Sequence, residues 1–157
     1  MLASVASFAL FMHLLGAFLL IGGTMVAGVG FETARRRERP DEIGLLLGVT
    51  RVGVLFVVVG GLIVLAFGLW LVELRHVGYG TGWVVASLVM LGAAAVLGAL
   101  GGRRPKQARL LATRLAADDQ KTTPELRALL DDGSSRAANY LSFVLMLGIV
   151  ALMVFKP

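Results

Sequence analysis

The sequence predicts an all-α integral membrane protein: a four-transmembrane-helix bundle with short amphipathic helices on its cytoplasmic side. Hydrophobic residues make up 57% of the 157 residues and charged residues only 16%, whereas an ordinary soluble domain has about 45–50% and 25%. Four stretches are mostly apolar over about 20 residues, the length a helix needs to cross a hydrocarbon core of about 30 Å. This composition excludes a soluble globular domain and a disordered chain.

The four predicted spans form a single membrane domain, and charged residues lie at or near their ends. We expect the first span to be retained, because it is too long for a signal-peptide core and no basic region precedes it. The spans cover about residues 3–30, 52–72, 82–100 and 137–155. The two long connections cover residues 31–51 and 101–136.

Basic residues are distributed unevenly between the two sides of the predicted bundle. Thirteen of the fifteen Lys and Arg residues fall in the two long connections, and the other two, Arg75 and Lys156, lie on the opposite side. The positive-inside rule therefore places both long connections in the cytoplasm and both termini outside. Trp70, Tyr79 and Trp83 fall at the outer span ends, where an interfacial aromatic belt is expected.

The cytoplasmic connections carry helix signals of their own. Pro40 favours a helix start that runs into the second span, and Thr123 before Pro124 is typical of a helix cap. Between residues 105 and 117, leucines share one face opposite the basic residues, the pattern of an interfacial helix. These leucines are Leu110, Leu111 and Leu115.

We expect the basic residues of these connections to contact anionic lipid headgroups rather than nucleic acid, because they flank membrane spans. The predicted membrane-surface residues are Arg35, Arg36, Arg37, Arg39, Arg103, Arg104, Lys106, Arg109 and Arg114.

His13 is the main candidate for chemistry, because an ionisable group inside a span is costly and usually faces the bundle interior or a wet cavity. A neutral imidazole can ligate iron or copper while its other nitrogen is held by an acceptor. The alternative is that His13 hydrogen-bonds a neighbouring helix and only packs. His76 lies in the short outer connection, where an exposed loop histidine is expected; it would join His13 in one cofactor site only if that loop folds inward.

Methionine thioethers suit Cu(I), and Met12 adjoins His13 as a second candidate metal ligand. Methionine is also an ordinary packing residue in membranes, and packing is the expected role. Met146 and Met153 are seven residues apart and share a helical face. Runs of small residues allow close helix packing within the chain or in a homodimer.

Other classes of protein are excluded or lack support. The chain has no cysteine, so disulfides, thiolate metal sites and a cysteine nucleophile are excluded. No phosphate-binding glycine loop, zinc-spaced histidine pair or catalytic triad pattern is present. The sequence therefore identifies no catalytic residues.

The first span also supports a family resemblance. It reads His13, Leu14, Leu15, Gly16, Ala17, then Ile21, Gly22, Gly23 and Thr24. This pattern resembles the opening of the CopD-like membrane proteins, which include HemJ-type protoporphyrinogen oxidases and small four-span bacterial proteins described as predicted integral membrane proteins. The small proteins are the closer match. Further likeness to their second and third helices comes from Gly68, Leu69, Trp70, Leu71, Gly82 and Trp83.

The resemblance implies a location in the bacterial cytoplasmic (inner) membrane and, for His13, an association with haem b as in HemJ-type proteins. CopD implies copper instead. Three functions therefore stay open: a haem-b protein with an electron-transfer or oxidoreductase role, a copper-handling protein, and a cofactor-free accessory subunit of a larger membrane complex.

Overall fold

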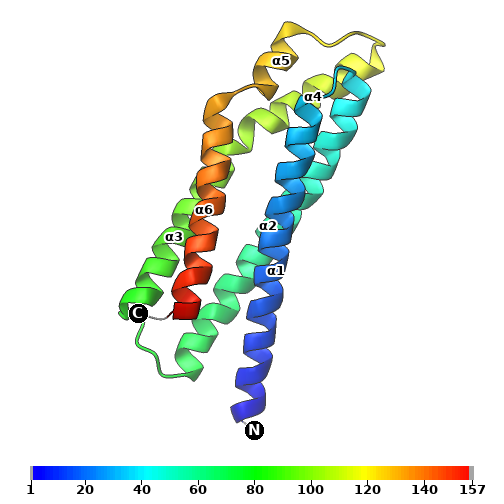
Figure 1. The fold of residues 1–157 in the computed structure, drawn as a ribbon. Helices are drawn as coiled ribbons and strands as arrows, with labels where there is room; N and C mark the ends of the chain where they lie inside the picture. Colours follow the sequence, from blue (N-terminus) through cyan, green and yellow to red (C-terminus); the bar gives the residue numbers. More distant parts are fainter. Residues whose placement is uncertain (1, 156–157) are drawn as a thin grey trace.

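The computed structural model describes residues 2–155, which form six helices and no strand (Figure 1). Lys156, counted above among the outer basic residues, lies outside the described residues. The helices are α1 (Leu2–Arg35), α2 (Pro40–Leu74), α3 (Gly82–Gly101), α4 (Arg103–Ala117), α5 (Pro124–Leu130) and α6 (Gly133–Phe155).

Four segments are long and apolar enough to cross a membrane, which confirms the predicted fold class. They are Ser4–Arg35, Pro40–Leu74, Gly82–Ala117 and Pro124–Phe155. Helices α1 and α2 have 34 and 35 residues, so each is about 50 Å long at 1.5 Å per residue. A hydrocarbon core is about 30 Å thick, and part of each helix must therefore lie outside it.

Helices α1 and α2 form an antiparallel pair whose backbones touch at glycines. Gly16 and Gly23 on α1 lie opposite Gly60 and Gly53 on α2. A Cβ atom added at Gly60 would lie 2.5 Å from the Leu20 backbone nitrogen, and one added at Gly23 would lie 2.6 Å from the Gly53 carbonyl oxygen. Only glycine allows this approach, which is how membrane helices gain dispersion contacts that lipid cannot supply.

Helices α3 and α6 form the second pair, and the two pairs lie side by side (Figure 1). The Ser142 hydroxyl on α6 donates a hydrogen bond to the Ala94 carbonyl on α3 at 2.9 Å. Leu20 of α1 packs with Ala94 and Met146 where the two pairs meet.

At the end away from the termini, a structure that we call the cap joins the two pairs; it consists of α4, α5 and the connections 36–39 and 118–123 (Figure 1). The cap packs on the ends of α1 and α2 around one hydrophobic cluster, which contains the largest fully buried side chains of the described residues: Ile43, Leu47, Leu126 and Leu130. Burying apolar groups that would otherwise contact water stabilises the fold, whereas burying apolar groups that would otherwise contact lipid stabilises it little. The best-buried core therefore lies in the cap, where the helices extend past the hydrocarbon.

The structure differs from the predictions at this end in two ways. Residues 31–35 of the predicted connection 31–51 are helical, because α1 continues to Arg35, whereas the start of α2 at Pro40 confirms the helix start predicted there. The predicted apolar face of α4 is also wrong in part: Leu115 is buried in the cap with Ala108 and Ala112, whereas Leu110 is exposed. The two alanines are small enough to let the protein, rather than lipid, cover that face.

Candidate functional site

His13 of α1 is buried against α2, with 7% of its surface exposed. Its Nδ1 lies 3.0 Å from the Val64 carbonyl oxygen on α2. Gly68, one turn further along α2, leaves space for the imidazole, since a Cβ there would lie 3.0 Å from the ring Cε1 atom. The ring therefore faces the bundle interior, as expected for an ionisable group within a span.

The Val64 carbonyl determines the tautomer of His13. A carbonyl oxygen can only accept, so Nδ1 must donate, and in the neutral imidazole Nε2 then carries a lone pair and no proton. Nε2 lies 3.5 Å from the sulfur of Met153 on α6. A thioether sulfur has no hydrogen to donate, so two electron-pair donors face each other between α1 and α6.

A second methionine of α6 contacts α1 further toward the cap. The Thr24 hydroxyl donates to the Leu20 carbonyl at 2.8 Å and lies 3.5 Å from the Met146 sulfur. Met146 and Met153 are seven residues apart, which is about 10 Å along a helix. Their predicted shared face is thus the face of α6 that meets α1.

The sequence identified His13 but not the partners of its ring. Met12 is half-buried and, as the next residue of the helix, points about 100° away from His13. The sulfur beside Nε2 belongs to Met153 instead. The signal that could have identified it was the seven-residue spacing of Met146 and Met153, because it marks one inward face.

His76 is placed elsewhere. It is exposed and lines a cavity of about 250 Å³ with Ala6, Glu73 and Leu74. Ala6 lies seven residues before His13, a separation of about 10 Å along α1. The structure therefore does not bring the two histidines into one site.

Glu73, which lines the same cavity, has a partner in the connection between α2 and α3. The Tyr79 hydroxyl donates to the Glu73 carboxylate at 3.1 Å. This hydrogen bond holds the phenolic proton and raises the pKa of Tyr79 above its usual value. Glu73 and His76 are the only His, Asp or Glu residues lining this cavity, and no group of three or more such residues in the described range could hold a metal ion.

The predicted membrane-surface residues form two clusters with different surroundings. Those before α2 are paired with carboxylates: Arg35 with Glu32 and Asp131, Arg36 with Glu32, Arg37 with Glu42, and Arg39 with Asp41. Those of α4 form no ion pair with any described residue; they are Arg103, Arg104, Lys106, Arg109 and Arg114.

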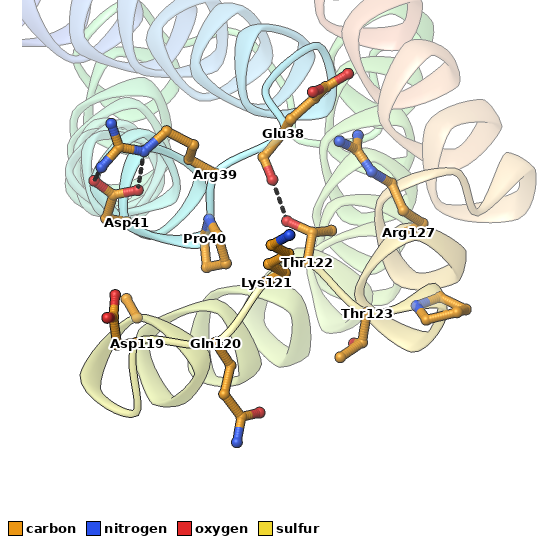
Figure 2. Close-up of a pocket in the computed structure, with 12 residues that line it drawn as sticks. Glu38, Arg39, Pro40, Asp41, Asp119, Gln120, Lys121, Thr122, Thr123 and Arg127 are labelled. Atoms are coloured by element: carbon orange, nitrogen blue, oxygen red, sulfur yellow. Dashed lines mark hydrogen bonds and ion pairs between the residues drawn. The ribbon is translucent and has the colours of Figure 1, made fainter.

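The cap also has a wide cleft of about 1010 Å³ beside the 36–39 and 118–123 connections (Figure 2). Arg127 donates to the carbonyls of Arg35 and Arg37, and the Thr122 hydroxyl donates to the Glu38 carbonyl. These hydrogen bonds connect α5 and the loop before it to the end of α1 and the residues that follow it. Three acidic and three basic side chains line the cleft, so its charge selects neither an anion nor a cation.

Comparison with known proteins places nearly the whole chain in one group. Residues 7–157 match the family described as "Predicted integral membrane protein (DUF2269)". No curated protein and no solved structure matches the chain. The resemblance to small predicted integral membrane proteins is thereby confirmed, whereas no match supports a specific relation to CopD or HemJ.

Proposed function

Because the chain belongs to the DUF2269 family of predicted integral membrane proteins, we propose that it acts within the bilayer, as a copper-handling protein that binds Cu(I) between His13 and Met153. One observation carries the proposal. The Nδ1 hydrogen bond to Val64 leaves the Nε2 lone pair of a buried imidazole 3.5 Å from a thioether sulfur. A ligating histidine is commonly held by such a bond from its other ring nitrogen to a carbonyl, and thioethers select Cu(I).

The distance between the two donor atoms also suits a metal ion. Ligand bonds of about 2.0 Å to nitrogen and 2.3 Å to sulfur place the two donor atoms about 3.5 Å apart when the bonds meet at a tetrahedral angle, and about 4.3 Å apart when only these two ligands bind and the bonds are collinear. The observed separation is 3.5 Å. An ion can therefore bind both atoms with little movement of α6 relative to α1.

The same pair of residues fits haem b less well. A haem iron bound by both residues would need room for the macrocycle between the two side chains, and hence donor atoms further apart than a directly contacting pair. Nε2 and the Met153 sulfur face each other directly. This geometry favours copper over the haem that the sequence resemblance implied for His13.

Copper binding is tested by titrating the detergent-purified chain with Cu(I) against a coloured chelator. We expect one Cu(I) per chain, no binding for His13→Ala, and at least about tenfold weaker binding for Met153→Leu, because one of the two donors is lost. Met25→Leu is the matched control, since Met25 is 55% exposed, and it should bind as the wild type does.

Three results would overturn the proposal. Equal binding by Met153→Leu and Met25→Leu would mean that copper binds at surface methionines. A Soret band in protein from haem-replete cells that disappears in His13→Ala would assign the histidine to haem. A wild-type chain that binds neither ligand would leave His13 as a packing residue, as in a cofactor-free accessory subunit.

We further propose that the cap faces the cytoplasm of a bacterial cell, because thirteen of the fifteen Lys and Arg residues lie at that end and basic residues near spans stay inside. The absence of cysteine permits a clean test with single cysteines. A membrane-impermeant maleimide should label Gly80→Cys in intact spheroplasts, and Gln107→Cys only after permeabilisation. The reverse labelling pattern would show that the cap faces outward.

A further inference from the structure

The two clusters of basic residues at the cap end differ in what neutralises them. Each arginine of the cluster before α2 has a carboxylate within 3.6 Å, and Arg35 has two. On α4, Arg104 interacts electrostatically with Asp132, whereas the other four cations make no ion pair with any described residue; they are Arg103, Lys106, Arg109 and Arg114. The first cluster is therefore largely compensated within the protein, whereas these four α4 cations are available to an external anion.

Three of these cations lie on one outer face of α4. The face comprises Arg103, Lys106, Leu110 and Arg114, and all four residues are exposed. The opposite face is buried in the cap by Ala108, Ala112 and Leu115. Leu110 is 46% exposed and lies between the cations along the helix. A leucine among lysine and arginine is typical of a helix face that contacts both headgroups and the adjoining acyl region.

The start of α4 lies where the apolar surface of the bundle ends. Helix α3 ends with the exposed Leu100 and with Gly101, and Arg103 follows two residues later. Asn139 of α6 packs against Gly101, and its neighbour Tyr140 is 64% exposed. An exposed tyrosine at this height is typical of the membrane interface, so the outer face of α4 begins at headgroup level.

We infer that the outer face of α4 binds anionic phospholipid headgroups and that the arginine cluster before α2 does not. The unpaired cations, the exposed leucine and the position at the interface favour a lipid over a soluble anion, which would leave Leu110 without an apolar partner. A single Lys or Arg near an anionic surface strengthens binding by about fivefold. The three cations together therefore determine which lipid binds at this end of the protein.

The test uses the full chain in detergent and native mass spectrometry with phosphatidylglycerol and with phosphatidylcholine of the same acyl chains. We expect the wild type to retain phosphatidylglycerol in preference to phosphatidylcholine. The triple α4 variant, Arg103→Gln/Lys106→Gln/Arg114→Gln, should retain at least about tenfold less phosphatidylglycerol. The matched control, Arg36→Gln/Arg37→Gln/Arg39→Gln, removes the same number of charges and should stay within about twofold of wild type. Retention of phosphatidylcholine should be the same in all three proteins.

Equal loss in both triple variants would overturn the inference, because total charge alone would then set lipid binding; so would loss in neither. Binding of a short RNA oligonucleotide to the α4 cations as strongly as phosphatidylglycerol would also overturn it in favour of a soluble polyanion. If the triple α4 variant does not fold, the single variants decide the matter: Lys106→Gln should lower retention of phosphatidylglycerol by about fivefold and Arg36→Gln should not.

Discussion

Replacing Gly60 with alanine is expected to lower the free energy of unfolding by about 1–3 kcal/mol, as overpacking of a close contact does. The added Cβ would lie 2.5 Å from the Leu20 nitrogen and 2.7 Å from the Gly16 carbonyl oxygen. Both are backbone atoms, so no side-chain rotation relieves the clash, and α1 must move away from α2. Reversible unfolding in mixed micelles, followed by circular dichroism, measures the change.

Gly22→Ala is the matched control, because a Cβ at Gly22 has nothing within 4 Å. It should leave stability unchanged or raise it by up to about 1 kcal/mol, since alanine is the better helix former. If Gly60→Ala proves as stable as Gly22→Ala, close backbone contact between α1 and α2 does not hold the pair together.

The pairing of the helices could not be predicted from hydropathy, although the existence of the spans could. Span length is fixed by the thickness of the hydrocarbon core, whereas lipid tails and leucine side chains are equally apolar and leave no preference for one neighbour. The information lies in glycine positions instead. Gly22 and Gly23 are adjacent in the sequence, yet only Gly23 faces α2, as does Gly16 seven residues earlier.

At the candidate site, the sequence was sufficient for His13 but not for its surroundings. The cost of an ionisable group in lipid predicts that His13 faces inward. Its hydrogen-bond acceptor, the Val64 carbonyl, is a backbone atom that any residue could supply. Its sulfur neighbour, Met153, is 140 residues away in the chain, so only the arrangement of the helices brings the two together.

The surroundings of α4 could not be predicted for a related reason: an amphipathic pattern shows that a face is covered, but not whether lipid or protein covers it. The pattern grouped Leu115 with Leu110 on one lipid-facing side. In the structure, Ala108 and Ala112 allow a close approach to the ends of α1 and α2, which buries Leu115 and turns Leu110 outward. The three leucines span too wide an arc of the helix for one surface to cover all of them.

That protein-covered core leads to a second large expected effect. Leu126→Ala should cost about 2–5 kcal/mol, the usual range for removing a fully buried leucine, because Leu126 has no exposed surface in the cap. Helix α5 has 7 residues, too few to be stable alone, so the loss should appear as local opening of α5. Amide exchange in detergent should accelerate at least about thirtyfold at residues 124–130, and amides in the middle of α1 and α2 should stay protected.

The matched control is Leu45→Ala on α2, which removes the same atoms from a side chain that is 73% exposed. It should leave exchange in α5 unchanged. No acceleration in Leu126→Ala would mean that α5 is held mainly by the polar bonds of Arg127 and Thr122 to the end of α1, and equal acceleration in both variants would mean that the effect does not depend on burial in the cap. The comparison therefore separates hydrophobic burial from hydrogen bonding as the force that keeps the cap closed over the ends of α1 and α2.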